Sequence, residues 1–207
     1  MNIEKAYNNW ADQYDTNENK TRDLDSKATI QTLNKYDFSK VVELGCGTGK
    51  NTTYLLTKAK EVIGLDFSQE MLNKAKGKFV NKRVTFLKAD LTREWKINNS
   101  YANLITCSLV LEHIKNLDFI FSEASKKLKK NGCFFISELH PFKQYSGSKA
   151  QYDTDKGTRE LETYVHHISE YLTIAHNNGF KLIELNEWFD EVIENEIPRL
   201  ISFVFQK

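Results

Sequence analysis

The stretch VVELGCGTG, residues 41–49, decides the expected fold. An apolar, β-branched run leads into an acidic residue and then into three glycines at alternate positions, Gly45, Gly47 and Gly49. Glycine permits a tight turn and lets a ligand approach the backbone closely. In open α/β sheets, ligands bind outside the carboxyl ends of the strands. We therefore expect residues 40–44 to form a strand and the glycines after it to form a ligand-binding loop.

The glycine spacing differs from that of two phosphate-binding loops. The dinucleotide-binding fingerprint is G-x-G-x-x-G, and here the third glycine, Gly49, comes one residue early. A P-loop requires Gly-Lys-Ser/Thr after four variable residues, whereas Gly49-Lys50 is followed by Asn51 at the wrong distance from Gly45. The loop therefore predicts a nucleotide-like ligand that is bound by neither of these motifs.

Strand and helix patterns alternate along the chain. Strands are expected at 40–44, 62–65, 83–87, 102–108, 133–139, 181–187 and 200–205, and helices at 50–58, 68–78, 117–130 and 167–177. The alternation predicts a three-layer, Rossmann-like α/β sandwich with a mostly parallel, seven-stranded sheet. Because only a loop separates the last two strands, we expect a hairpin there, with the last strand antiparallel.

Two segments lie outside this alternation, within what we expect to be a single domain spanning residues 1–207. Residues 1–36 have a helical and aromatic pattern, and we expect them to form an N-terminal helical cap over the ligand edge of the sheet. Residues 140–165 show no strong period. Since long irregular insertions often bind ligands, this segment is predicted to be an insertion that serves as a substrate lid.

Composition and charge limit the classes of partner. The chain is 40% hydrophobic and 28% charged with a formal net charge of +1, which lacks the basic excess typical of nucleic-acid binding. No apolar run approaches the roughly 20 residues of a membrane-spanning helix, and the first residues lack a signal-peptide core. Cys46, Cys107 and Cys133 are isolated and show no zinc-ligand spacing. We expect a cytoplasmic protein without a metal site.

The motifs follow the order found in the class I S-adenosylmethionine (SAM)-dependent methyltransferases. Glu43-x-Gly45-x-Gly47-x-Gly49 resembles motif I of that family. Residues 62–68, 84–91 and 101–113 resemble the next three motifs, and LKKNGC at 128–133 is similar to the family's helix-to-strand turn, with Lys130-Asn131 in place of Pro-Gly. The resemblance covers most of the chain and is closest to the group of quinone-biosynthesis and malonyl-ester methyltransferases. It implies SAM as cofactor and S-adenosylhomocysteine (SAH) as product.

The resemblance also implies a set of donor-binding residues whose chemistry suits the parts of SAM. The glycine-loop amides suit its carboxylate, and Asp66, which is 66 − 45 = 21 residues after Gly45, suits the ribose hydroxyls. Asp90 and the Leu91 amide suit the adenine edge. The set, which adds residues for the methionine end and the adenine faces, is Tyr7, Tyr14, Glu43, Gly45, Cys46, Gly47, Gly49, Asp66, Phe67, Met71, Asp90, Leu91 and Cys107.

Candidate catalytic groups are fewer. Methyl transfer is a displacement at an activated carbon, so positioning and desolvation carry much of the catalysis. A base is needed only where the acceptor must lose a proton. His113 and His140 follow the fourth and fifth expected strands at the ligand edge, which makes them the candidate bases. A structural or capping role is the alternative for His113, and substrate contact is the further possibility for His140.

The acceptor is predicted to be a small molecule. Residues 106–109 read TCSL, where amino-methylating DNA enzymes carry Asn/Asp-Pro-Pro-Tyr. Aromatic residues in both segments outside the alternation suggest an apolar or aromatic acceptor, with O, N, C and S all open as the methylated atom. Two alternatives stay open: a catalytically inactive SAM-binding regulatory or partner protein, and an unusual RNA methyltransferase. The sequence does not predict an oligomeric state.

Overall fold

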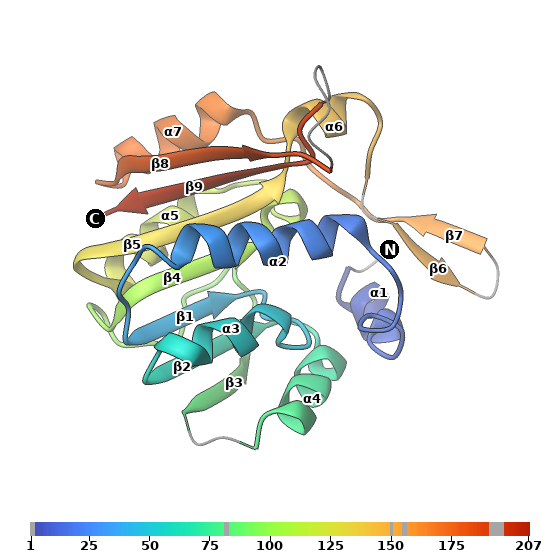
Figure 1. Ribbon diagram of the computed structural model, residues 1–207, viewed down its shortest axis with the longest axis horizontal. Coiled ribbons are helices and arrows are strands. Elements are labelled where there is room, and N and C mark those ends of the chain that lie inside the picture. Colours follow the sequence, from blue (N-terminus) through green and yellow to red (C-terminus); the bar gives the residue numbers. More distant parts are fainter. Residues whose placement is uncertain (1–2, 81–82, 150, 155–156, 191–196) are drawn as a thin grey trace.

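The computed structural model describes residues 3–80, 83–149, 151–154, 157–190 and 197–207, and this part of the chain forms a seven-stranded main sheet (Figure 1). Its strands are β1 (Lys40–Leu44), β2 (Glu61–Asp66), β3 (Val84–Lys88), β4 (Ala102–Ser108), β5 (Leu128–Leu139), β8 (Lys181–Trp188) and β9 (Leu200–Gln206). The strand order is β3-β2-β1-β4-β5-β9-β8, and β9 is antiparallel to both its neighbours. The predicted Rossmann-like sheet with an antiparallel last strand is confirmed.

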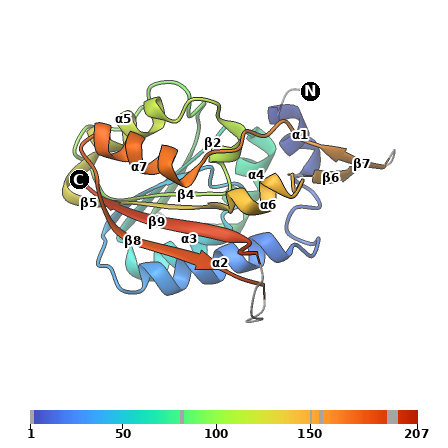
Figure 2. The ribbon, with the colours of Figure 1, turned by 90° about the horizontal axis from the view of Figure 1, so that it is seen from above.

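Helices cover both faces of this sheet. α2 (Lys20–Leu33) and α3 (Lys50–Lys58) lie on one face, and α5 (Asp118–Lys127) and α7 (Ile168–Asn177) lie on the other (Figure 2). α4 (Gln69–Lys78) packs against β2 and β3. α4 begins after Ser68, whose hydroxyl oxygen accepts a hydrogen bond from the Met71 amide at 3.2 Å. The helices therefore bury the apolar strands on both sides and leave the strand ends accessible.

The helix before β5 ends earlier than the sequence predicts. The sequence pattern places its end at Lys130, whereas α5 ends at Lys127 and β5 begins at Leu128. Asn131 has φ 64°, a left-handed conformation that asparagine adopts more readily than most residues, and its amide donates to the Lys207 carbonyl at 3.0 Å. The predicted helix-ending turn is thus an irregularity inside β5, which pairing with the end of the chain stabilises.

The N-terminal segment divides into two helices with different positions. α1 (Ile3–Trp10) packs against α4 at the edge where β1 and β2 end (Figure 1). α2 instead lies across the sheet against β5 and β9, and its Leu33 joins the core beside Val41 and Phe135. Only α1 therefore has the position expected for a cap, and α2 belongs to the outer helical layer.

The insertion after β5 is more regular than expected. It contains a short helix, α6 (Pro141–Tyr145), and two antiparallel strands, β6 (Gln151–Thr154) and β7 (Gly157–Glu160), which extend away from the main sheet (Figure 1). Leu161, which follows the second of these strands, packs against Ala6 of α1. The prediction of an irregular segment was wrong because four-residue strands are too short to show a clear period. Within the described residues no helix combines the length and apolarity needed to cross a membrane.

Candidate functional site

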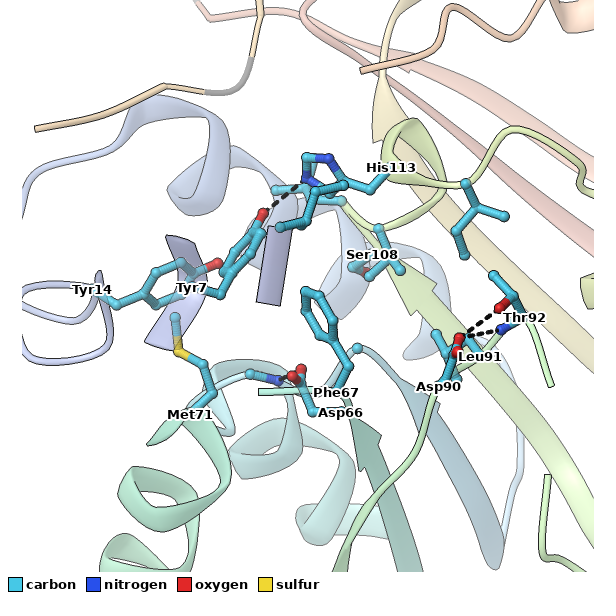
Figure 3. A pocket seen from close by; sticks show the side chains of 16 residues that line it. Tyr7, Tyr14, Asp66, Phe67, Met71, Asp90, Leu91, Thr92, Ser108 and His113 are labelled. Atoms are coloured by element: carbon cyan, nitrogen blue, oxygen red, sulfur yellow. Dashed lines mark hydrogen bonds between the residues drawn. The ribbon is translucent and has the colours of Figure 1, made fainter. Parts of the chain in front are cut away.

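A cavity of about 210 Å³, called here the main cavity, lies at the carboxyl ends of β1, β2 and β4 (Figure 3). Most of the predicted donor-binding residues and one candidate base line it: Tyr7, Tyr14, Gly45, Gly47, Asp66, Phe67, Met71, Asp90, Leu91 and His113. The rest of its wall includes Thr92, Ser108, Leu109 and Val110. The structure thus brings together residues from five separate stretches of the sequence.

The three glycines of the loop have different local surroundings. Gly45 has φ 63°, and a Cβ atom there would lie 2.2 Å from Cγ2 of Val110. Gly47 has φ 52° and open space where a Cβ would stand, so a ligand can approach its backbone. Gly49 has φ 83° at the start of α3, and a Cβ there would meet the Phe79 ring instead of the cavity. Two glycines therefore shape the cavity, and the third permits close packing.

Asp66 ends β2 and holds its carboxylate at the cavity wall. Its Oδ2 accepts a hydrogen bond from the Gly47 amide at 2.8 Å, and its Oδ1 accepts one from the Ser68 amide at 2.8 Å. Burial raises the pKa of Asp66 to about 6, although these amides lower it. The carboxylate therefore couples the glycine loop to the start of α4 at the place predicted for the ribose.

Phe67, Met71 and Leu91 give the main cavity an apolar region (Figure 3). Met71 is buried in α4, and Leu91 follows β3. Beside them, Asp90 Oδ1 accepts hydrogen bonds from the Thr92 amide at 3.0 Å and from its hydroxyl at 2.6 Å. An apolar slot with one carboxylate at its rim suits a planar ring that carries an amino group.

A smaller cavity of about 50 Å³ adjoins the main cavity and shares Gly45 and Gly47 with it. Glu43 and Cys46, two of the predicted donor-binding residues, line this smaller cavity together with the buried Asp25. Glu43 accepts a hydrogen bond from the Thr52 hydroxyl, and burial raises the pKa of Glu43 to about 8. Cys107 lines neither cavity, because its side chain is fully buried in β4.

A third cavity of about 330 Å³, called here the basic cavity, lies next to the main one. It is lined by Tyr7, Trp10, Tyr14, Asn19, Thr21, Arg22, Leu109, Glu112, Leu139, Ser148, Lys149 and Arg199. Tyr7, Tyr14 and Leu109 line both cavities. Leu109 has φ 56°, a strained conformation for leucine that the hydrogen bond from its amide to the Ser137 carbonyl helps to hold. Sequence reasoning missed this cavity because it has no motif.

His113 and Tyr7 form a hydrogen-bonded pair in the main cavity (Figure 3). The Tyr7 hydroxyl lies 2.9 Å from Nε2 of His113, and Nδ1 of the same ring lies 3.1 Å from the Glu162 carbonyl oxygen. Since a carbonyl only accepts, Nδ1 carries the proton, and Nε2 accepts from Tyr7. Burial lowers the pKa of His113, which favours the neutral ring.

The second candidate base, His140, lies elsewhere. Its side chain is fully buried, its Nδ1 accepts a hydrogen bond from the Phe142 amide at the start of α6, and its Nε2 lies 3.0 Å from Glu187 Oε1. It lines none of the three cavities. The geometry instead makes the His140 ring the N-cap of α6, away from the cavity that the other candidate base lines. In the described part of the chain, no cluster of three His, Cys, Asp or Glu side chains could hold a metal ion.

Comparison with known proteins agrees with this geometry. A family described as "Methyltransferase domain" matches residues 42–136. An uncharacterized methyltransferase of Emericella nidulans is 27% identical, over 88% of this chain and 77% of that protein. A ubiquinone biosynthesis O-methyltransferase of Pelagibacter ubique is 26% identical, over 75% of this chain and 67% of that protein. An S-adenosylmethionine-dependent methyltransferase from Mesorhizobium loti shares the fold, with TM-score 0.75 and 18% identity over 89% of this chain and 98% of that one.

The sheet is Rossmann-like, and Asp66 at the end of its second strand lies beside the glycine loop, an arrangement typical of proteins that bind nucleotide-like ligands. The family match indicates methyltransferases among such proteins. Residues 42–136 match the methyltransferase-domain family, and the relatives and the fold together support a class I SAM-dependent methyltransferase. SAM is the cofactor of this family and SAH its product. The expectations of family, fold and cofactor drawn from the motifs are confirmed.

Proposed function

We propose that this protein transfers a methyl group from SAM to a small-molecule acceptor by direct displacement and releases SAH. One observation carries the proposal: the main cavity and the basic cavity share a wall made of Tyr7, Tyr14 and Leu109. A methyl transferase needs a donor site and an acceptor site in contact, because the reacting atoms must come within about 3–3.5 Å of one another. Two adjoining cavities with one common wall meet that need.

The residues of the main cavity suit SAM. The open space at Gly47 leaves room for the methionine part beside the loop amides and the start of α3. The two oxygens of Asp66 suit the ribose hydroxyls, and the slot of Phe67, Met71 and Leu91 suits the adenine ring. When bound, SAM supplies a sulfonium-activated methyl group. We therefore assign donor binding to the predicted residues that line the main cavity, with Glu43 and Cys46 behind the loop.

Tyr7 and His113 are the groups that we propose to remove a proton from the acceptor. Tyr7 lines both cavities, and its hydroxyl already donates to His113 Nε2. If the acceptor hydroxyl or amine gives its proton to the Tyr7 oxygen, the Tyr7 proton passes to His113. The carbonyl of Glu162 stabilises the resulting imidazolium through Nδ1. The pair can therefore accept one proton without exposing it to water.

The volume of the basic cavity, about 330 Å³, supports a small-molecule acceptor. α1 and the residues after α6 wall the cavity, and Leu161 joins the insertion to α1 through Ala6. This contact supports the proposed lid role of residues 140–165 within a single domain. The free Cys46, Cys107 and Cys133 accord with a cytoplasmic location, which we include in the proposal.

The first test is isothermal titration of the protein with SAM and with SAH, followed by a radiolabelled-methyl assay on a panel of small alcohols, phenols, amines and carboxylic acids. We expect both nucleotides to bind and at least one acceptor to yield SAH stoichiometrically with methylated product. Binding without turnover on any acceptor, or salt-dependent methylation of RNA alone, would contradict a small-molecule methyltransferase. No binding of either nucleotide would contradict the donor site itself.

A further inference from the structure

The basic cavity carries more positive than negative charge. Arg22, Lys149 and Arg199 line it, and Glu112 is the one acidic residue among the described residues of its wall. Burial raises the pKa of Glu112 to about 7, so near neutral pH its carboxyl offsets less than one full charge. An excess of positive charge around a cavity attracts ligands of the opposite sign.

Arg22 is the least compensated of the three cations. It is 8% exposed, and its terminal nitrogens donate to the carbonyls of Tyr14 and, at 2.9 Å, Asn17. Its Nε has no partner, and no carboxylate of the described residues lies within ion-pair distance. The Tyr14 ring packs on it, 4.2 Å from the guanidinium carbon to the ring centroid. Asp15 and Asp23 act on this guanidinium through longer-range electrostatics, but neither forms an ion pair with it. Because burying a guanidinium without a paired carboxylate is costly, a bound anion would stabilise this site.

Arg199, the residue before β9, lines the same cavity. It forms a two-pronged ion pair with Asp190 through Nε and one terminal nitrogen. Its other terminal nitrogen donates to the Thr21 hydroxyl at 3.1 Å, and Thr21 also lines the cavity. Asp190 therefore fixes the orientation of this guanidinium and leaves one of its edges toward the cavity side. Lys149 is more exposed and pairs with Glu160.

We infer that the methyl acceptor carries an anionic group, a carboxylate or a phosphate-type oxyanion, which binds in the basic cavity beside Arg22 and Arg199. The acceptor atom then lies at the common wall near Tyr7, so one molecule spans from the cations to the donor. The rings of Tyr7, Trp10 and Tyr14 line the same cavity and contact the apolar part of that molecule. This inference rests on the proposed function, and it changes the expected acceptor from simply apolar or aromatic to amphiphilic and anionic.

Matched acid and neutral probes test this inference directly. Benzoate and benzamide, and phenyl phosphate and phenol, are titrated into the protein, with and without saturating SAH. We expect the anionic member of at least one pair to bind about tenfold more tightly than its neutral partner, because charge-assisted hydrogen bonds are stronger than neutral ones. Equal affinities within both pairs, or no binding of either anion, would contradict an anion site.

Variants locate the anion and identify its source. Arg22→Gln and Arg199→Gln should each abolish the preference for the anionic probe. Arg83→Gln is the matched control, because Arg83 also donates to two carbonyls, those of Leu56 at 3.1 Å and Ala59 at 3.2 Å, and lines none of the three cavities. Far-UV circular dichroism and thermal melting check folding, and Arg199→Gln decides the question if Arg22→Gln does not fold.

The two proposals fail in different ways. If Arg22→Gln weakens SAH binding and leaves the acid–amide difference intact, the anion that Arg22 binds is the carboxylate of the donor, and the placement of the acceptor's anionic group beside Arg22 is wrong. If the wild type binds no SAH, the donor site is wrong, while the titrations without SAH still decide the anion site. A preference for anions that survives both substitutions overturns the placement in the basic cavity.

Discussion

The main cavity and the basic cavity adjoin, yet they are built in different ways. Loops that follow strands of the sheet form much of the main cavity, and the backbone of Gly45 and Gly47 is part of its wall. Side chains from α1, α2, the residues after α6 and the residue before β9 form the basic cavity. The main cavity is formed mostly by the sheet and its loops, whereas the basic cavity depends on the N-terminal helices and the insertion after β5. We therefore expect substitutions in the two regions to separate donor binding from acceptor binding.

The largest effect is expected where the fold itself binds the donor. Asp66→Ala removes the carboxylate that suits two ribose hydroxyls, and hydrogen bonds to charged groups contribute about 1.5–3 kcal/mol each. SAH affinity measured by titration calorimetry should fall at least about 100-fold. Arg199→Gln, in the basic cavity, should leave it within about threefold. Equal losses of SAH affinity in the two variants would show that the two cavities do not act separately.

The next effect is expected at the pair that touches both cavities. His113→Gln removes the proton acceptor of Tyr7 and should lower kcat about 100-fold once an acceptor is in hand, with little change in SAH affinity. Because the neutral ring accepts the proton and burial lowers its pKa, wild-type kcat should fall only as the pH drops below the ordinary range for histidine, about 6.5. An unchanged kcat in this variant would assign His113 a purely structural role.

A smaller effect, on stability, tests the close approach of the glycine loop to the segment that follows β4. A Cβ at Gly45 would lie 2.2 Å from the Val110 side chain, and its φ of 63° is unfavourable for alanine. Gly45→Ala should lower the free energy of unfolding by about 1–3 kcal/mol in urea titrations. Gly77→Ala, in α4 with open space around the new atom, should raise it by about 0.5–1 kcal/mol. The same sign for both would contradict the strain assigned to Gly45.

The smallest effect concerns pH and the donor alone. The pKa of Asp66 is raised to about 6, and its charged form accepts the ribose hydroxyls. Below about pH 6 the carboxyl must lose a proton on binding, so SAH affinity should fall about tenfold per pH unit. Above that pH it should level off. Asp66→Asn should show weak binding with a flat profile between pH 5 and 7, and a sloping profile in this variant would assign the titration to another group.

The sequence predicts the main cavity well because most of its wall follows a strand directly, with Tyr7 and Tyr14 added from the N-terminal segment. The order of apolar runs and the glycines after 40–44 determine which residues meet at the sheet edge, and Asp66 follows from its distance to Gly45. Gly49 and Cys107 are the exceptions. The spacing of the glycines does not reveal that Gly49 packs against Phe79, and the strand pattern does not reveal that the Cys107 side chain lies in the core.

The basic cavity could not be predicted in the same way. Arg22 lies in a helix with no clear apolar face, and Arg199 lies 199 − 22 = 177 residues further along the chain. Neither belongs to a motif, and only the tertiary fold brings them to one wall. For the same reason His140 looked like a site residue, because a position after a strand does not reveal that its ring caps α6.

The common wall has a consequence for the order of events in a catalytic cycle. Tyr7 and Tyr14 line both cavities. A donor bound in the main cavity therefore fixes the orientation of the two tyrosine rings that also border the basic cavity. We expect SAM to bind first and SAH to leave last. Initial-rate measurements should then show SAH as a competitive inhibitor against SAM and a noncompetitive inhibitor against the acceptor. Random addition would instead mean that the two tyrosines are already fixed before either ligand binds.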